Sequence, residues 1–377
     1  MGLFDFFTQK IGIDLGTSNT LIYVNNKGIT VNEPSVVAIN TISNEVCAVG
    51  DDAKAMLDRT PKTISAIRPL KNGVIADFEI TRAMIKYFIT KALNKKRFVK
   101  SNIVISVPVG VTSIERRAVE EVAYDAGARK VKLVEEPMAA AIGAGLNVDQ
   151  PVGNMIIDIG GGTTEIAVIS LGGIVESDSL RIAGDDIDVN IKDYVKNKYK
   201  MDIGLVTAEK IKMTLGNASK DYYYKNSISD LNDEDNKDTK DIEDIEDIED
   251  IESDDDIADN KEYNVEEINS AFQKMEIRGR DIVSGLPLKI TITSDEIREA
   301  IIETVNSIVN AIKRVLERTP PELSSDIYTN GIYLSGGGAL LKGLDIYIEK
   351  ETGIKVFAAD NPLQSVALGA GKICEYI

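Results

Sequence analysis

The chain has 377 residues, of which 43% are hydrophobic, and its formal net charge is −18. This length favours two domains, and the apolar fraction provides for a sizeable core. The sequence contains no histidine, which excludes Ser-His-Asp and Cys-His catalysis, histidine general bases and histidine metal ligands. Any chemistry must therefore use carboxylates, hydroxyls, backbone N–H groups and a hard cation.

Several simple features favour a cytoplasmic location. Cys47 and Cys374 lie too far apart in the sequence to indicate a disulfide framework. No apolar run reaches the roughly 18 residues that a membrane helix needs. The N-terminus also lacks the basic region and the small-residue cleavage site of a signal peptide.

The negative charge is concentrated in one segment. Residues 230–259 hold 17 Asp or Glu side chains against two lysines, which leaves about −3 for the rest of the chain. Four DIE repeats at 241–252 give no stable helical face, and dense like charge repels itself. We expect residues 221–268 to be a disordered acidic insertion, with a helix formed against a basic partner as the alternative. No basic stripe compensates this charge, which argues against nucleic acid as the main partner.

Two glycine-rich turns of similar sequence lie between apolar strands. Residues 11–24 read IGIDLGTSNTLIYV, and residues 155–169 read MIIDIGGGTTEIAVI. The flanking apolar runs predict β-strands with the glycines at the turn. Two copies 144 residues apart indicate duplication of a whole domain, with a first domain at 11–150 and a second at 151–377.

The remaining pattern alternates between strands and helices and predicts an α/β fold. In the first half we expect a strand at 103–109, a helix at 112–126 capped by Thr112 or Ser113, a strand at 131–134 and a helix at 136–146. In the second half we expect helices at 185–199 and 207–216, a strand at 286–293, a helix at 294–318 capped by Ser294, and a strand entering a triple-glycine turn at 331–338.

The two glycine turns suit a polyphosphate. Glycine lets the backbone approach closely, and the N–H groups of such a turn can form an anion-binding concavity. One such turn alone is more often a plain β-hairpin, but two in one chain favour phosphate binding. Neither matches the Walker A loop or the Rossmann fingerprint. The candidate phosphate-binding residues are Gly16, Thr17, Ser18, Asn19, Gly160, Gly161, Gly162 and Thr163.

Carboxylates accompany both turns. Asp14 and Asp158 would repel phosphate directly, so we expect them to hold Mg²⁺ through its waters. Glu135 and Glu136 precede Pro137 at the start of a helix, where a carboxylate ordinarily stabilises the helix dipole. The alternative is that one of these two glutamates orients the water that attacks a γ-phosphate.

Four segments together carry a family resemblance: IGIDLGTSNT, LVEEPMAAAIGAG, DIGGGTTEIAVI and YLSGGGALLKGL. They resemble the superfamily of actin, heat-shock chaperone and sugar kinase ATPases, and more specifically the MreB family of bacterial actins. AVGDDAKAML, RPLKNGVIADF, MEIRGRDIVSGLP and TPPELSSDI support this resemblance, which covers residues 10–377 except the acidic insertion. It implies an actin-like two-domain fold of duplicated ribonuclease-H-like cores with smaller subdomains, and ATP with Mg²⁺ between the domains.

The resemblance also implies roles for individual residues. Asp14 and Asp158 would serve Mg²⁺, and Glu136 would orient the attacking water with help from Thr163. Glu209 and Lys212 would contact the ribose and adenine side, although by themselves they read as an ordinary exposed helix pair. Gly336, Gly337 and Gly338 would form the floor of the adenine pocket. The preference for ATP over GTP rests on the resemblance alone.

The implied activity is weak ATP hydrolysis coupled to polymerisation. The family forms filaments, usually paired antiparallel protofilaments, on the inner membrane surface, where they organise wall synthesis and maintain cell shape. For membrane contact we expect an N-terminal segment, residues 1–10, and a loop near residue 98; a frayed tail or one packed on its own domain is the alternative. The candidate membrane residues are Leu3, Phe4, Phe6, Phe7, Phe98 and Val99.

Three other members of the superfamily are alternatives to this interpretation. A chaperone-type ATPase would need a substrate domain after the second half. A sugar or acetate kinase would need its own catalytic aspartate beside the γ-phosphate, and a cell-division or plasmid-partition actin would differ mainly in partner and membrane tail. The acidic insertion would fall in the smaller subdomain of the second half, near the expected longitudinal filament contact.

Overall fold

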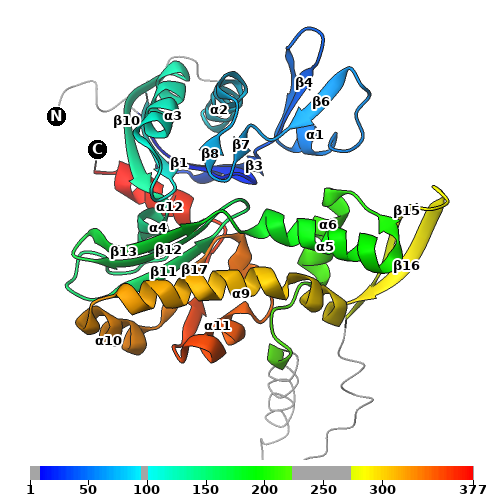
Figure 1. The fold of residues 1–377 in the computed structure, drawn as a ribbon. Helices are drawn as coiled ribbons and strands as arrows, with labels where there is room; N and C mark the ends of the chain where they lie inside the picture. Colours follow the sequence, from blue (N-terminus) through cyan, green and yellow to red (C-terminus); the bar gives the residue numbers. More distant parts are fainter. Residues whose placement is uncertain (1–8, 95–100, 223–272, 377) are drawn as a thin grey trace, which may run out of the picture.

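The computed structural model describes residues 9–94, 101–222 and 273–376. It has two lobes, each built on a five-stranded sheet, and the helices α4 (Glu136–Gly143) and α12 (Ser365–Cys374) lie between the two sheets (Figure 1). The predicted α/β class and two-domain plan are confirmed. Residues 1–8, the loop with Phe98 and Val99, and all but the start of the acidic insertion lie outside the described residues.

The sheet of the first lobe combines an antiparallel meander with two parallel strands. The meander β1-β2-β3 is extended on the other side of β1 by the parallel strands β9 and β10, which gives the order β10-β9-β1-β2-β3. Its strands are β1 (Gln9–Leu15), β2 (Asn19–Val24), β3 (Gly28–Pro34), β9 (Ser101–Val107) and β10 (Ala128–Glu135).

The sheet of the second lobe repeats this plan. The meander β11-β12-β13 is extended by the parallel strands β17 and β18, which gives the order β13-β12-β11-β17-β18. Its strands are β11 (Asn154–Ile159), β12 (Thr164–Ser170), β13 (Gly173–Leu180), β17 (Ile332–Ser335) and β18 (Val356–Ala358). Each strand has a counterpart in the first lobe, so the duplication predicted from the two glycine turns extends to the whole sheet.

Both glycine turns occupy the same position in their sheets. The last strand pair before the turn is Leu15 with Thr20 in the first lobe and Ile159 with Thr164 in the second. The strand that enters each turn also runs parallel to its other neighbour, β9 or β17. The turns therefore lie at the carboxyl edge of the parallel strands, where α/β proteins bind ligands.

Two capped helices cover the first sheet. α2 (Phe78–Ala92) begins after Asp77, whose side chain accepts a hydrogen bond from a backbone N–H of the first turn. α3 (Ser113–Asp125) begins after Thr112, one of the two predicted caps, which forms a reciprocal capping pair with Glu115. Gly127 follows α3 with a φ of +104°, a conformation that favours glycine and ends the helix.

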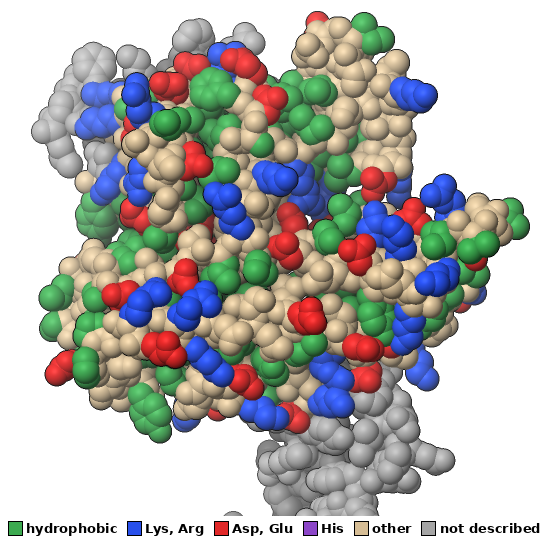
Figure 2. Space-filling model, viewed as in Figure 1, with side chains coloured by type: hydrophobic (Ala, Val, Ile, Leu, Met, Phe, Trp, Pro, Cys, Tyr) green, Lys and Arg blue, Asp and Glu red, His purple; other side chains and the backbone are tan. Residues whose placement is uncertain are grey.

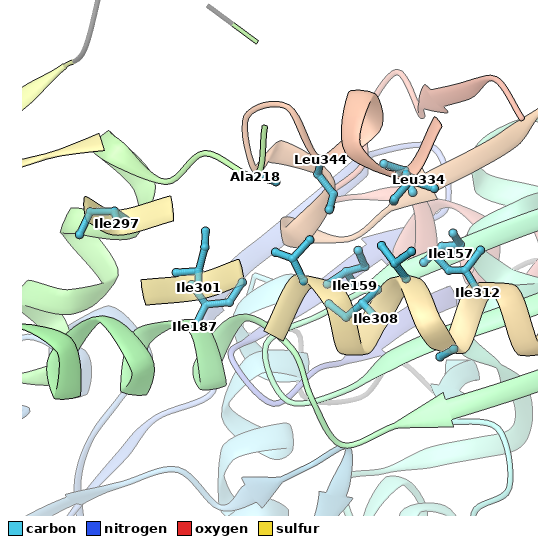
Figure 3. Packing of buried hydrophobic residues seen from close by; sticks show 14 of the residues in the cluster. Ile157, Ile159, Ile187, Ala218, Ile297, Ile301, Ile308, Ile312, Leu334 and Leu344 are labelled. Carbon is cyan, nitrogen blue, oxygen red and sulfur yellow. The ribbon is translucent and has the colours of Figure 1, made fainter. Parts of the chain in front are cut away.

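The long helix α9 (Ser294–Arg318) covers the second sheet. Its apolar stripe is buried, and Ile308 and Ile312 lie beside Ile157 and Ile159 of β11 (Figure 3). The predicted cap at Ser294 is wrong, because the capping residue is Thr293 and Ser294 is the first residue of the helix. Serine and threonine both cap helices through a side-chain hydroxyl, so residue type alone does not identify which of two adjacent candidates is the cap.

Smaller elements extend each lobe. The first lobe carries β4 (Val37–Asn40), β5 (Val46–Val49), α1 (Asp51–Lys54), β6 (Ile64–Ile67), β7 (Leu70–Lys71) and β8 (Val74–Ile75). The second carries α5 (Gly184–Tyr199), β14 (Met201–Asp202), α6 (Leu205–Leu215), β15 (Lys274–Asp281), β16 (Pro287–Thr293), α10 (Pro321–Asn330), η2 (Gly337–Leu340) and α11 (Leu344–Thr352). Among the described residues, no helix has both the length and the apolar character needed to cross a membrane.

α4 and α12 pack closely through small residues. A Cβ atom on Gly369 would lie 1.8 Å from the carbonyl oxygen of Ala139. On the other side of α12, a Cβ atom on Gly12 of β1 would lie 2.3 Å from the backbone nitrogen of Gly371. Near its end the chain therefore returns to the first sheet. A boundary at residue 150 separates the two sheets in the sequence, but α12, which follows that boundary, packs against the first sheet.

Candidate functional site

The backbone of the first glycine turn is held from one side. The carbonyl oxygens of Gly16 and Ser18 accept hydrogen bonds from the hydroxyl (2.7 Å) and the backbone N–H (2.9 Å) of Ser35. In a trans peptide the C=O and the following N–H point in opposite directions. The N–H groups of Thr17 and Asn19 therefore face away from Ser35, which makes them available to an anion.

The second turn uses a different partner for the same purpose. The carbonyl oxygens of Gly160 and Gly161 accept hydrogen bonds from the backbone N–H groups of Gly184 (3.1 Å) and Asp185 (2.8 Å), in the first turn of α5. The N–H groups of Gly161 and Gly162 consequently face away from α5. Both predicted phosphate turns thus present backbone donors on the side opposite their supports.

The two threonines of the repeated motif are structural. Thr20 and Thr164 are fully buried. The hydroxyl of Thr20 lies 2.8 Å from that of Ser35, and the hydroxyl of Thr164 donates to the carbonyl of Ile182 at 2.7 Å. Each threonine therefore anchors the segment that supports its own turn.

The two turns meet between the lobes. A Cβ atom on Gly161 would lie 2.0 Å from Oγ of Ser18, and one on Gly162 would lie 2.7 Å from Oγ1 of Thr17. Only glycine fits such contacts unless the neighbouring side chain moves. A groove of about 940 Å³ lies elsewhere, along α2 in the first lobe, lined by residues such as Ile39.

A short hairpin that the sequence reading missed reaches both turns. Asn72 and Gly73 join β7 to β8 with φ values of +50° and +74°, as in the Asn-Gly turns that favour tight hairpins. The backbone N–H of Gly73 donates to Oγ1 of Thr17 at 2.9 Å. A Cβ atom on Gly73 would lie 3.2 Å from Cγ2 of Thr163, so the hairpin tip also touches the second turn. The Asn-Gly pair between Leu-Lys and Val-Ile is the signal that predicts it.

Asp14 and Asp158 come together beside the turns. Burial raises the pKa of Asp14 to about 7, and the charge of Asp158 adds to this effect. Burial also raises the pKa of Asp158 to about 6. Asp158 is 6% exposed and its Oδ1 has no hydrogen-bond partner, while Oδ1 of Asp14 receives only a long contact, 3.4 Å, from Ser106. These oxygens can therefore coordinate a cation or accept hydrogen bonds from its water ligands.

The donor set fits a magnesium ion that keeps much of its water shell. Within residues 9–94, 101–222 and 273–376, no cluster of three or more Asp, Glu, Cys or His side chains could hold a metal ion by itself. Mg²⁺ is commonly bound through one or two carboxylates together with water and substrate phosphates. Asp14 and Asp158 supply two carboxylates, and the backbone N–H groups of the adjacent turns would donate hydrogen bonds to the phosphates.

The structure separates the two adjacent glutamates. Glu135 pairs with Arg116 at 2.7 Å and is partly exposed. Glu136, the first residue of α4, is 6% exposed. Burial raises its pKa well above the usual range, and the charges of Glu165, Asp14 and Asp158 act in the same direction. Glu136 therefore belongs to the carboxylate group between the lobes, and Glu135 does not.

Glu165 is a buried acid that the sequence reading did not select. It is fully buried in β12, directly across from Asp158 in the strand pairing. Its carboxylate accepts hydrogen bonds from the hydroxyl of Ser179 (2.7 Å) and from the backbone N–H of Val109 in the first lobe (3.1 Å). Burial raises its pKa to about 7. A glutamate directly before the apolar run IAVI of this strand is the signal that marks it.

The residues expected on the adenine side make internal contacts. Glu209 of α6 pairs with Lys54 of the first lobe at 2.9 Å. Lys212 donates to the carbonyl of Gly184 at 2.8 Å and pairs with Asp188 at 3.0 Å. Glu209 therefore lies at the junction of the lobes, and Lys212 lies at the first turn of α5. The two do not form the exposed helix pair that the residue types alone indicate.

The triple glycine lies against the base of the second turn. A Cβ atom on Gly336 would lie 2.3 Å from the carbonyl oxygen of Ile159, and one on Gly338 would lie 2.2 Å from its side chain. Gly336 also has a φ of +78°. Gly337 is less constrained, because its nearest neighbour is a flexible side-chain end of Leu363 at 3.4 Å.

A duplicated sheet with a glycine turn in each copy, facing one another between two lobes, defines the actin-like class of proteins. The family model described as MreB/Mbl protein matches residues 8–230 and 256–377. The chain belongs to this MreB/Mbl family.

Named relatives agree with this assignment. The chain is 46% identical to the cell shape-determining protein Mbl of Bacillus cereus over 371 residues, which cover 98% of this chain and 97% of that protein. It is 45% identical to the cell shape-determining protein MreB of Escherichia coli, over 98% and 94% of the two chains. Among solved structures it resembles MreB5 of Spiroplasma citri bound to ADP, with a TM-score of 0.80, 35% identity and coverage of 98% and 96%. The same protein bound to AMPPNP gives a TM-score of 0.80 at 34% identity.

Proposed function

We propose that this chain is an ATP-binding cytoskeletal protein that hydrolyses ATP slowly and assembles into membrane-associated filaments that maintain cell shape. The observation that carries the nucleotide part is the pair of glycine turns, each with its carbonyls bonded on one side and its N–H groups turned to the other, beside buried Asp14 and Asp158. The relative from Spiroplasma citri, solved with ADP and with AMPPNP, supports this proposal.

The residues around the two turns would have different roles in nucleotide binding. Thr17, Ser18 and Asn19 add donors to the first turn, whereas Gly160, Gly161 and Gly162 leave room for phosphate oxygens at the second. Bound Mg²⁺ would supply positive charge that offsets the phosphates and the two aspartates. Glu209, Lys212 and the triple glycine at 336–338 would then lie toward the ribose and adenine.

Glu136 is the residue we assign to the hydrolysis step. Its carboxylate would accept a hydrogen bond from a water molecule and align its oxygen with the γ-phosphorus, while the hydroxyl of Thr163 holds the same water. The water oxygen forms the new bond to phosphorus, the bond to the β–γ bridging oxygen breaks, and the proton that the water loses passes to a phosphate oxygen. Such positioning, more than strong basicity, is what phosphoryl transfer requires of the protein. The burial of both residues, at 6% and 7% exposed, supports this role.

Assembly and membrane contact rest on the family. The relatives named cell shape-determining support a role in cell shape. We propose a homopolymer of paired protofilaments as the working form. We further propose that the cytoplasmic membrane surface and the wall-synthesis machinery are its partners, with Leu3, Phe4, Phe6, Phe7, Phe98 and Val99 as the membrane residues.

The decisive experiment is electron microscopy of the purified chain on anionic lipid vesicles with Mg²⁺ and ATP. We expect sheets or paired filaments that require ATP. A matched variant that lacks residues 221–268 tests whether the acidic insertion alone blocks assembly. Monomers under all conditions, in both the full chain and this variant, would contradict the filament proposal and favour a chaperone-type or other ATPase of the superfamily.

A further inference from the structure

Arg68 and Asp185 form a polar cluster with Ser18 at the first glycine turn. Arg68 follows β6 in the first lobe, Asp185 lies in the first turn of α5 in the second lobe, and Ser18 lies in the turn itself. Figure 2 shows acidic and basic side chains near one another where the two lobes meet. None of the phosphate-binding features described above accounts for Arg68 or for the side chain of Asp185.

The contacts centre on the carboxylate of Asp185. Nη1 of Arg68 donates to both of its oxygens at 3.0 Å, and the hydroxyl of Ser18 donates to Oδ1 at 3.1 Å. Nη1 of Arg68 also lies 3.2 Å from Oγ of Ser18. An anion held by a guanidinium and by a hydroxyl of a phosphate turn has the environment that a phosphate group requires.

We propose that Arg68 is a phosphate ligand and that the carboxylate of Asp185 substitutes for a phosphate oxygen when no nucleotide is bound. This inference rests on the proposed nucleotide site and extends it by two residues. A terminal phosphate entering between the turns takes the donors of Arg68 and Ser18. Asp185 then loses its partners and faces a like charge, so it moves away from the phosphate.

Substitutions of Arg68 and of Asp185 should therefore change ATP affinity in opposite directions. Removing Arg68 removes a charge-assisted hydrogen bond from the ligand, so ATP binding weakens. Removing the charge of Asp185 removes the internal competitor, so ATP binding tightens. If this ion pair only held the lobes together, either substitution would break the same pair. Both substitutions would then change ATP affinity in the same direction.

The test compares ATP and ADP affinities of R68A, R68K and D185N, in the full chain with Mg²⁺, by equilibrium binding of fluorescent nucleotides. We expect R68A to weaken ATP binding at least about tenfold, R68K to weaken it less, and D185N to tighten it about threefold or more. On an R68A background the gain from D185N should shrink, because the two groups are coupled.

A matched ion pair provides the control. Arg82 and Asp125 pair at 3.3 Å on the surface of the first lobe, so R82A and D125N measure the effect of losing an Arg–Asp pair away from the turns. D185N is nearly isosteric with the natural residue, so it stays informative even if R68A folds poorly. Failure of the natural chain to bind ATP overturns the proposed function. Normal binding by the natural chain together with weaker ATP binding by D185N overturns the inference about Asp185 and Arg68.

Discussion

Replacing Asp14 with asparagine should stabilise the nucleotide-free protein at alkaline pH and abolish its stabilisation by Mg²⁺ and ATP. Asp14 lies at the end of β1 among buried carboxylates, and burial, followed by the charge of Asp158, raises its pKa from 3.8 to about 7. Above that pH the folded protein must hold this charge without a cation. Asparagine keeps the shape of the side chain and removes the charge.

The magnitude follows from the shift in pKa. About three units at 1.36 kcal/mol each correspond to a cost of about 4 kcal/mol for the ionised form. The side chain is not fully sealed from solvent, so water relieves part of this cost and we expect about 2 kcal/mol. Because the folded pKa is raised, the stability that protonation of Asp14 gives is fully present below about pH 4 and is lost as pH rises to about 7.

Urea unfolding at pH 8 and at pH 5, with EDTA present, measures the difference between D14N and the natural chain. The advantage of D14N should be largest at pH 8 and should diminish toward pH 4. D345N, at an exposed aspartate of α11, is the control and should show no such trend. The reasoning fails if D14N is the less stable protein at pH 8, or if Mg²⁺ and ATP raise its melting temperature as much as that of the natural chain.

Three further predictions concern the turns and the proposed hydrolysis. E136A should bind ATP within about threefold of the natural affinity but release phosphate about 100-fold more slowly, and unchanged phosphate release would exclude the water-positioning role. G161A should weaken ATP binding far more than G160A, because the added methyl groups meet their nearest atoms at 2.0 Å and 3.3 Å; equal affinities of these two variants would contradict this geometry. T164V should lower the free energy of unfolding by about 1–3 kcal/mol in urea titrations, since it leaves the carbonyl of Ile182 without its donor, and a change below about 0.5 kcal/mol would refute this.

Strong periodicity and repetition explain which parts of the fold could be predicted. α9 was recognisable because its apolar stripe persists over 25 residues, and the two central hairpins because they recur in one chain. β10 is longer than the predicted strand at 131–134 because Lys130 and Lys132 alternate with apolar residues on a half-exposed strand. Residues 37–75 give no comparable signal, because β4 to β8 are at most four residues long and pair with each other rather than with the repeated sheet.

The site was predictable where backbone chemistry dictates residue type. Glycine at 161 and 162 and aspartate at 14 and 158 are the residue types that the proposed phosphate and cation binding requires. The structure places the two glycines against the first turn and the two aspartates close to each other. The contributions of Gly73, Glu165 and Arg68 depend on contacts between residues 50 or more positions apart, which spacing along the chain does not reveal. The choice between Glu135 and Glu136 likewise depended on Arg116, which pairs with the former.

The two turns are alike in backbone but differ in the segments that support them. Under the proposed function, this difference determines which parts of the chain respond to bound phosphate. Ser35 supports the first turn from within the first lobe. The first turn of α5 supports the second turn through the N–H groups of Gly184 and Asp185, and the side chain of Asp185 also reaches Ser18 of the first turn. α5 therefore contacts both glycine turns while the rest of the helix packs against α6 and α9. Any movement of Asp185 on nucleotide binding would act on the smaller subdomain of the second lobe through this one helix.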